Sequence, residues 1–242
     1  MTVLALDIGG TRLAASAGAR TQRTLVRATG QESLDALLAL ADEVVEGEIE
    51  DVGVSFSGPV EDDHVHSHHT PGWDDIGLHE LLRERFRAPV VVENDANAGA
   101  LAEWDAAGRP GEPVAYITID TGIGAGIVFN GEILEGSHRL AGEIGHFVVE
   151  PDGAVCACGK QGCVETLASG PAIAKHGNYS EAAKALNVAI EALVAVVDPL
   201  FVAVGGGVSN APALWEALGK RAVRARSTPL RGAEIIAERA AA

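Results

Sequence analysis

The chain has 242 residues, of which 47% are hydrophobic and 21% charged, an ordinary balance for a globular protein with one large core or two smaller ones. Its formal net charge of −16 disfavours binding to a phosphate backbone, so nucleic acid is not expected as a partner. The sequence lacks a run of about 18 apolar residues and a basic, apolar start. We therefore expect no membrane span, no signal peptide and a cytoplasmic location.

The first half alternates short apolar runs with helical patterns. Val3–Leu6 and Leu13–Ala17 flank the Gly-containing turn Asp7–Thr11, which predicts a β-hairpin. The following periodicities predict a helix over Gln31–Val45, a strand over Val52–Phe56, a helix over Leu78–Phe86, a strand over Pro89–Val92 and a helix over Ala96–Ala106.

A breaker-rich segment at 108–113 suggests a domain boundary, after which the pattern of the first half returns. A strand at Val114–Ile119 leads into the Gly turn Asp120–Gly124 and a second strand, Ala125–Phe129, with a turn at Asn130-Gly131. The remaining expected elements are a helix over Tyr179–Val197, a strand over Pro199–Val204, a turn at Gly205–Gly207 and a helix over Pro212–Ala225. This repeat predicts an α/β protein of two similar lobes, residues 1–108 and 109–242, with a ligand cleft between them and a last helix free to pack back on the first lobe.

The Gly-rich turns admit two interpretations. Each is either a tight turn that needs Gly or a phosphate cradle, in which exposed N–H groups and a Thr hydroxyl bind an anion. In the second interpretation Asp7 holds Mg²⁺ through water. The residues concerned are Gly9, Gly10 and Thr11, then Thr121 and Gly122, and finally Gly205, Gly206 and Gly207, which suit close approach by adenine. No GxxxxGK[ST] segment is present, so this is not a P-loop protein.

Asp95 lies where an apolar strand runs into a helix. One interpretation makes it the N-cap of that helix. The other makes it a general base at the carboxyl end of a strand, which orients a sugar hydroxyl and accepts its proton during phosphoryl transfer. Asn94, next to it, is suited to hydrogen bonding with neighbouring hydroxyls.

The three cysteines, Cys156, Cys158 and Cys163, lie within eight residues and follow His146. One His and three Cys form a closed tetrahedral Zn²⁺ set of the structural type. The alternative is a set of buried free thiols beside an unrelated His. An odd number of cysteines in a reducing compartment argues against disulfides.

The order and spacing of the Gly turns resemble the ASKHA superfamily (actin, sugar kinase, heat-shock protein), in which two duplicated, ribonuclease H-like lobes clamp ATP. Nearly the whole chain further resembles the ROK family (repressor, open reading frame, kinase). The matching segments are Asp7–Thr11, Ser57–Val60, Pro71–Trp73, Glu93–Asn97, Gly122–Gly126, Gly142–His146, the Cys loop and Gly205–Gly207.

This resemblance implies an ATP-dependent sugar kinase that acts as a homodimer. Asp95 would be the base, and Asn94, Asp95, Glu143, His146 and Glu165 would bind the sugar. His146 would also bind a structural Zn²⁺ through its other ring nitrogen, and Mg²⁺ would act with ATP. The nucleotide would contact Asp7, Gly9, Gly10, Thr11, Thr121, Gly122, Gly205, Gly206 and Gly207.

Two features depart from the family pattern. The stretch from Ser169 to Gly205 is short, so the nucleotide lobe is abbreviated. The segment 62–72 contains four of the eight His residues: His64, His66, His68 and His69. One interpretation is a solvated polar loop, and another is a second metal site. A third is that His68 or His69 contacts the sugar and contributes to its specificity.

Three functions remain open. The first is a glucokinase-like enzyme that phosphorylates the 6-hydroxyl of an aldohexose. The second is an N-acetylhexosamine or fructose kinase of the same family. The third is a non-catalytic sugar sensor, although the first Gly turn begins at residue 7 and leaves no room before it for the DNA-binding domain of the ROK repressors.

Overall fold

A computed structural model describes residues 2–61, 64–67, 72–74 and 76–240. The chain forms two compact units, one of Met1–Ala102 with Thr228–Ala242 and the other of Glu103–Ser227. From the sequence we placed the boundary after residue 108 and left the last helix free to pack back on the first lobe. The structure divides the chain after Ala102 and includes the C-terminal segment in the first unit. Within the described residues, no helix is both long enough and apolar enough to cross a bilayer.

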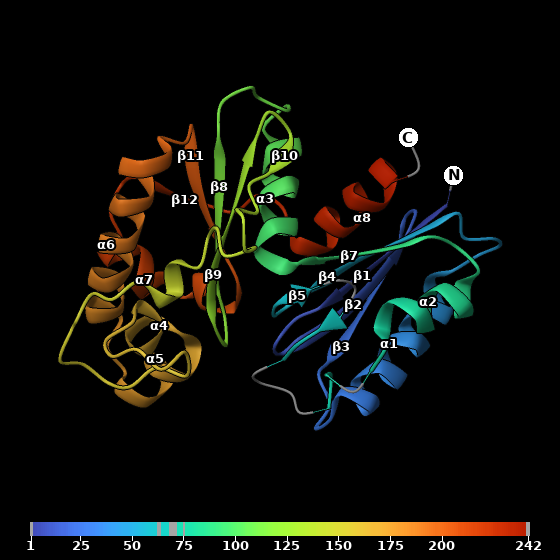
Figure 1. Cartoon of the computed structure of the whole chain (residues 1–242), viewed down its shortest axis with the longest axis horizontal. Helices are drawn as coiled ribbons and strands as arrows, with labels where there is room; N and C mark the ends of the chain where they lie inside the picture. The colour runs from blue at the N-terminus through green and yellow to red at the C-terminus, as the bar shows by residue number, and fades with distance from the viewer. Residues whose placement is uncertain (1, 62–63, 68–71, 75, 241–242) are drawn as a thin grey trace. The chain divides into compact units, whose positions relative to one another are not determined.

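The first unit is built on a five-stranded mixed sheet with the order β3-β2-β1-β4-β7 (Figure 1). Strand β1 pairs antiparallel with β2, as the expected hairpin requires, and it also pairs parallel with β4. The elements of this unit are β1 Val3–Ile8, β2 Arg12–Ala17, β3 Arg20–Leu25, α1 Gly30–Val44, β4 Asp51–Phe56, β5 Val60–Glu61, β6 His64–Val65, α2 Leu78–Phe86, β7 Val90–Asn94, the start of α3 Asp95–Ala106, and α8 Pro229–Ala240.

Helices cover both faces of this sheet (Figure 1). Helix α1 buries Leu34, Leu37 and Ala41 in the core that it shares with α2, and Thr29 caps its first turn by accepting a bond from the N–H of Glu32. Helix α8 packs on the opposite face at such short range that a Cβ on Gly53 would overlap the carbonyl oxygen of Ala233. The sheet therefore needs small residues under α8.

The second unit repeats this topology in the sheet β10-β9-β8-β11-β12. Three antiparallel strands are again followed by two parallel ones, which confirms the expected duplication of the α/β fold. Its elements are the end of α3, β8 Val114–Ile119, β9 Ile123–Phe129, β10 Glu132–Ile133, the 3₁₀ turn η1 Ile144–His146, α4 Val164–Ala168, α5 Gly170–His176, α6 Tyr179–Val197, β11 Phe201–Gly205, the 3₁₀ turn η2 Gly207–Asn210, α7 Pro212–Ala217 and β12 Ala222–Arg224.

One expected helix is wrong in its second half. Helix α7 ends at Ala217 instead of continuing to Ala225, and Leu218 is extended. Gly219, a poor helix former, donates its N–H to the side chain of Asn187, and Ala222–Arg224 then add a parallel edge strand beside β11. Strand pairing in the tertiary structure therefore overrides the helical pattern here. The polar edge strand β3 was not predicted, because every residue of Arg20–Leu25 is exposed or half-buried.

A buried carboxylate joins the two points where the chain enters and leaves the second unit. Glu103 is 1% exposed, and its Oε1 accepts bonds from the N–H groups of Arg226 and Ser227, both at 2.6 Å. Backbone N–H bonds to a charged acceptor are among the stronger hydrogen bonds in proteins. The contact ties the start of this unit to its last residues.

Candidate active site and metal centre

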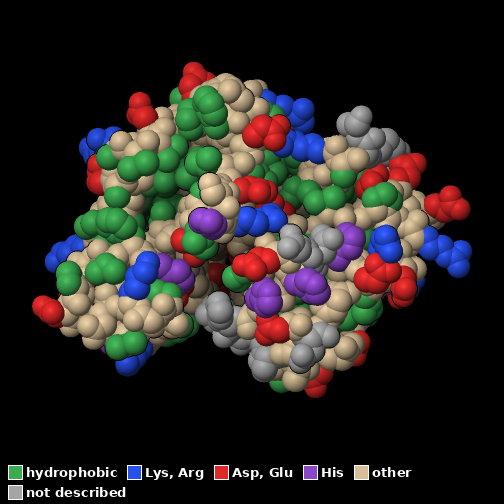
Figure 2. Space-filling model, in the orientation of Figure 1, with side chains coloured by type: hydrophobic (Ala, Val, Ile, Leu, Met, Phe, Trp, Pro, Cys, Tyr) green, Lys and Arg blue, Asp and Glu red, His purple; other side chains and the backbone are tan. Residues whose placement is uncertain are grey.

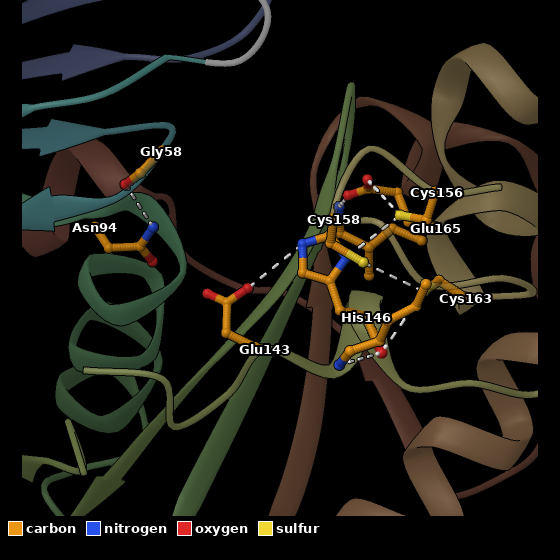
Figure 3. Close-up of polar contacts among 10 residues, drawn as sticks. Gly58, Asn94, Glu143, His146, Cys156, Cys158, Cys163 and Glu165 are labelled. Carbon is orange, nitrogen blue, oxygen red and sulfur yellow. Dashed lines mark hydrogen bonds and ion pairs between the residues drawn. The ribbon is translucent and has the colours of Figure 1, made fainter. Parts of the chain in front are cut away.

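Strand β7 runs directly into α3, and Asn94 caps the helix there. Its Oδ1 accepts bonds from the N–H groups of Ala96 at 2.9 Å and Asn97 at 3.3 Å. Asp95 is the first helical residue, so the interpretation that Asp95 itself is the cap is wrong. The Nδ2 of Asn94 donates to the carbonyl oxygen of Gly58 at 3.1 Å, which holds a neighbouring turn against the helix start (Figure 3).

Three polar side chains form a row across the parallel strands of the first sheet. Asp7 pairs with Ser55, and Ser55 pairs with Glu93, so the strand register places all three on one face. The Oε1 of Glu93 accepts bonds from the N–H of Asn94 and from Nδ2 of Asn97. Ser55 is fully buried, and its Oγ has no hydrogen-bond partner among the described residues. No role was assigned to Ser55 or Glu93 from the sequence, although each interrupts an apolar strand.

The turn between β1 and β2 contains Gly9, Gly10 and Thr11. The N–H of Gly9 donates to the carbonyl oxygen of Arg12 at 2.9 Å and closes the turn. Thr11 is exposed, and its carbonyl oxygen accepts a bond from Val26. This geometry suits a tight hairpin and also leaves the Thr11 hydroxyl at the surface.

The two Gly turns of the second unit lie together. Asp120 closes the β8–β9 turn by donating its N–H to the carbonyl oxygen of Gly122, and its Oδ2 accepts a bond from the N–H of Gly207 at 3.4 Å. Gly206 has a φ of 83°, and a Cβ there would overlap the backbone of Ile119. The structure thus brings Thr121 and Gly122 beside Gly205–Gly207, and Asp120, to which no role was assigned from the sequence, connects them.

The predicted metal ligands also meet. The ligand atoms of His146, Cys156, Cys158 and Cys163 all lie within 4.8 Å of one another. The Sγ atoms of Cys158 and Cys163 are 3.6 Å apart, far beyond a disulfide bond. Zn–S bonds of about 2.3 Å in a tetrahedron place sulfurs about 3.8 Å apart, so this spacing fits a Cys₃His zinc site.

Glycine lets the short loop close around this cluster. Gly162 has a φ of 68°, and a Cβ on it would overlap the carbonyl group of Glu150. The loop is further closed by the bond from the N–H of Cys156 to the carbonyl oxygen of Lys160, at 2.8 Å. A side chain at position 162 is therefore incompatible with this loop.

Burial opposes ionisation of two of the three cysteines. Burial raises the pKa of the Cys163 thiol to about 12 and also raises the pKa of Cys156. The pKa of Cys158 is lowered, chiefly by a hydrogen bond from the backbone of Lys160. A divalent cation binds cysteines as thiolates, so its positive charge would offset the cost of ionising these buried thiols.

His146 presents one ring nitrogen to the cysteines and the other away from them (Figure 3). Its Nδ1 lies 3.6 Å from Sγ of Cys156, and its Nε2 lies 3.7 Å from Oε2 of Glu143. The Oε2 of Glu165 accepts a bond from the N–H of Ile123, and its Oε1 lies 3.9 Å from Sγ of Cys156. The three sugar-binding candidates of the second unit, Glu143, His146 and Glu165, therefore gather around the metal cluster.

The His-rich segment is described only in part. His66 Nδ1 lies 2.8 Å from Oδ1 of Asp74, and His64 lies in β6 and is exposed. His68 and His69 lie outside the described residues. Among the described residues, no second group of three or more His, Cys, Asp or Glu side chains gathers as the Cys loop does, so His64 and His66 do not form a metal site there by themselves.

The repeated sheets define the class of this protein, the duplicated α/β fold of the actin-like ATPases. The model of the ROK family matches residues 3–183, and the chain therefore belongs to the ROK family.

Three relatives illustrate the match. The glucokinase of Halalkalibacterium halodurans is 46% identical over 128 residues, which are 51% of this chain and 39% of that protein. An N-acetylmannosamine kinase of Shigella boydii is 38% identical over 185 residues, 72% of this chain and 63% of that protein. The chain thus spans less than two thirds of the length of either. The structure of a ROK family glucokinase from Streptomyces griseus, in complex with glucose and AMPPNP, aligns with a TM-score of 0.82 and 27% identity over 99% of this chain and 100% of that chain.

Proposed function

We propose that this chain is an ATP-dependent sugar kinase that phosphorylates the 6-hydroxyl of an aldohexose, with glucose as the first candidate. The observation that carries the proposal is the end-to-end structural match to a ROK glucokinase solved with glucose and AMPPNP. The glucokinase and N-acetylmannosamine kinase relatives support sugar phosphorylation as the common activity.

Asp95 is proposed as the general base. Its position at the start of α3, directly after a sheet strand, supports this role because the cap of the helix is supplied by Asn94. The Asp95 carboxylate orients the sugar hydroxyl and accepts its proton as the phosphoryl group is transferred.

Asn94, Glu143, His146 and Glu165 are proposed to bind the other hydroxyls. Asn94 already uses its Oδ1 for two backbone N–H groups and one Nδ2 proton for Gly58. An amide nitrogen has two protons, so Asn94 contributes one donor to the sugar and no acceptor. Glu143 is exposed and accepts from a hydroxyl, whereas the ring of His146 is oriented by the metal cluster.

The nucleotide is proposed to contact Asp7, Gly9, Gly10 and Thr11 of the first unit, and Thr121, Gly122, Gly205, Gly206 and Gly207 of the second. Mg²⁺ prefers oxygen ligands and retains water, and the Asp7 carboxylate offers a suitable oxygen. When bound with ATP, Mg²⁺ supplies charge neutralisation for the transferred phosphoryl group. Zn²⁺ at the Cys₃His set is proposed to be structural, because four protein ligands leave no open position.

A second candidate is an N-acetylhexosamine kinase, favoured by the N-acetylmannosamine kinase relative, whose match covers more of this chain than that of the glucokinase. Release of ADP should be measured with ATP, Mg²⁺ and a panel of glucose, mannose, fructose, allose, N-acetylglucosamine and N-acetylmannosamine. Highest kcat/KM with glucose supports the first candidate, and highest kcat/KM with an N-acetylated sugar replaces it by the second. Sugar binding without ADP release from any member contradicts a kinase and indicates a sensor.

We also propose that the protein acts as a cytoplasmic homodimer without a nucleic-acid partner. The net charge of −16 supports the last point. On the face shown in Figure 2, Lys and Arg side chains occur singly or in small groups among acidic ones, without the broad basic patch that binds nucleic acid. Light scattering coupled to gel filtration tests the dimer directly.

A further inference from the structure

Glu93 is a buried carboxylate near the end of β7, directly before α3. It is only 7% exposed. Its Oε1 accepts two hydrogen bonds, from the N–H of Asn94 at 2.7 Å and from Nδ2 of Asn97 at 3.0 Å. A carboxylate loses hydration on burial, and hydrogen bonds to the charged oxygen compensate for this loss. Glu93 thus connects the end of the strand to the first turn of the helix.

The two residues that Glu93 holds lie on either side of Asp95. Asn94 precedes Asp95 in the chain, and Asn97 follows it in the first turn of α3. Asn94 adds a second clamp over the same turn, since its Oδ1 accepts bonds from the N–H groups of Ala96 and Asn97. Three side-chain hydrogen bonds therefore span the backbone of Asp95, and a rotation of that backbone would strain all of them.

The first turn of a helix depends on such bonds. Its N–H groups have no partners within the helix, so caps and neighbouring side chains have to fix its shape. The position of a general base has to be precise as well, because a displacement of about 1 Å can lower a rate about 10²-fold. Asp95, the proposed base, lies in this turn.

We propose that Glu93 is a positioning residue for phosphoryl transfer, which fixes the carboxylate of Asp95 through the first turn of α3. This inference rests on the proposed kinase function, with Asp95 as the base. Glu93 acts through Asp95 and contacts no reacting atom, so its loss should lower kcat and spare sugar affinity. Asn94 keeps its bonds to Gly58 and to the helix when Glu93 is replaced, so its proposed contact with the sugar should persist.

The test measures kcat from ADP release and the sugar Kd by calorimetry, with the sugar of the panel that gives the highest kcat/KM. The variants are Glu93→Ala, Asn97→Ala and Glu93→Gln, which keeps a carbonyl oxygen able to accept both bonds. The matched control is Asp51→Ala, because Asp51 is 6% exposed and begins β4, at the opposite end of the strand beside β7. Urea denaturation and zinc content verify that each variant is folded.

Glu93→Ala should lower kcat about 10²-fold with the sugar Kd changed only a few-fold, and Glu93→Gln should recover most of this loss. Asn97→Ala removes one bond across Asp95 and should lower kcat about tenfold. Asp51→Ala should be less stable than the wild type and should keep its kcat. In the Asp95→Asn background, Glu93→Ala should cause no further fall in kcat, because a positioning residue has no effect once the base is absent.

Four results would overturn the inference. They are a wild-type kcat in folded Glu93→Ala, an equal loss of kcat in Glu93→Gln, an equal loss in Asp51→Ala, and a further multiplicative loss in the Asp95→Asn background. If Glu93→Ala does not fold, Asn97→Ala decides, and a wild-type kcat in that variant contradicts the inference. A wild-type protein that releases no ADP with any sugar of the panel would instead contradict the proposed function itself.

Discussion

The ring of His146 turns its Nδ1 toward Sγ of Cys156, at 3.6 Å. The opposite nitrogen then faces the carboxylate of Glu143. A neutral imidazole that binds zinc through Nδ1 carries its proton on Nε2, which becomes a donor of fixed direction. The proposed metal site therefore fixes the orientation of the His146 ring, and through it the position of the donor that His146 would offer to the sugar.

Loss of zinc should weaken sugar binding. Cys163 is fully buried, and Cys163→Ser removes one of the four proposed ligands. The site should then no longer retain the zinc ion proposed to bind there, and the sugar KM should rise by at least about tenfold. Zinc content and ADP release measure the two effects. Ala157→Ser, a change in the same loop at a position without a ligand, should keep both values near those of the wild type. A zinc-free variant with an unchanged KM would break the proposed link.

Asp95→Asn should abolish most turnover while leaving the sugar bound. A general base contributes about 10²- to 10⁴-fold, so kcat should fall by that factor, with the sugar Kd changed only a few-fold. Asp105→Asn, the same substitution near the end of α3, serves as the control. If kcat of Asp95→Asn stays within about tenfold of the wild type, another residue accepts the proton.

Asn94→Ala should destabilise the fold by removing the cap of α3. Loss of a side-chain cap lowers the free energy of unfolding by about 0.5–2 kcal/mol, and the bond to Gly58 is lost as well. Asn94→Ser restores a capping oxygen without the bond to Gly58, so urea denaturation should place it between Asn94→Ala and the wild type. Equal stability of the two variants would show that the cap contributes nothing.

Glu103→Ala should cost more stability than Glu103→Gln. The alanine variant leaves the N–H groups of Arg226 and Ser227 without their acceptor, which should lower the free energy of unfolding by about 1–3 kcal/mol. Glutamine keeps an uncharged carbonyl oxygen in the same place and should lose only part of this. Urea denaturation measures the difference, and an alanine variant as stable as the wild type would contradict it.

Local patterns were sufficient for most elements of the fold. The hairpin Val3–Ile8 and Arg12–Ala17 follows from two apolar runs around a Gly turn, and helices α2 at Leu78–Phe86 and α6 at Tyr179–Val197 follow from helical periodicity, because each of these signals lies within its own segment. Asn130 and Gly131 both have positive φ, as the predicted two-residue turn requires. The Cys and His spacing likewise identified the one metal cluster found among the described residues.

Contacts between distant residues were decided only by the tertiary structure. Sequence alone left Asp95 between two roles, the N-cap of α3 and a general base, and only the hydrogen bonds of the structure assign the cap to Asn94. Ala222–Arg224 became a strand because a free sheet edge was available beside β11. Asp120 and Gly207 are 87 positions apart, and their contact exists because β8 and β11 are neighbours in the sheet. Spacing along the chain reports local propensity, whereas the pairing of strands determines which distant side chains meet.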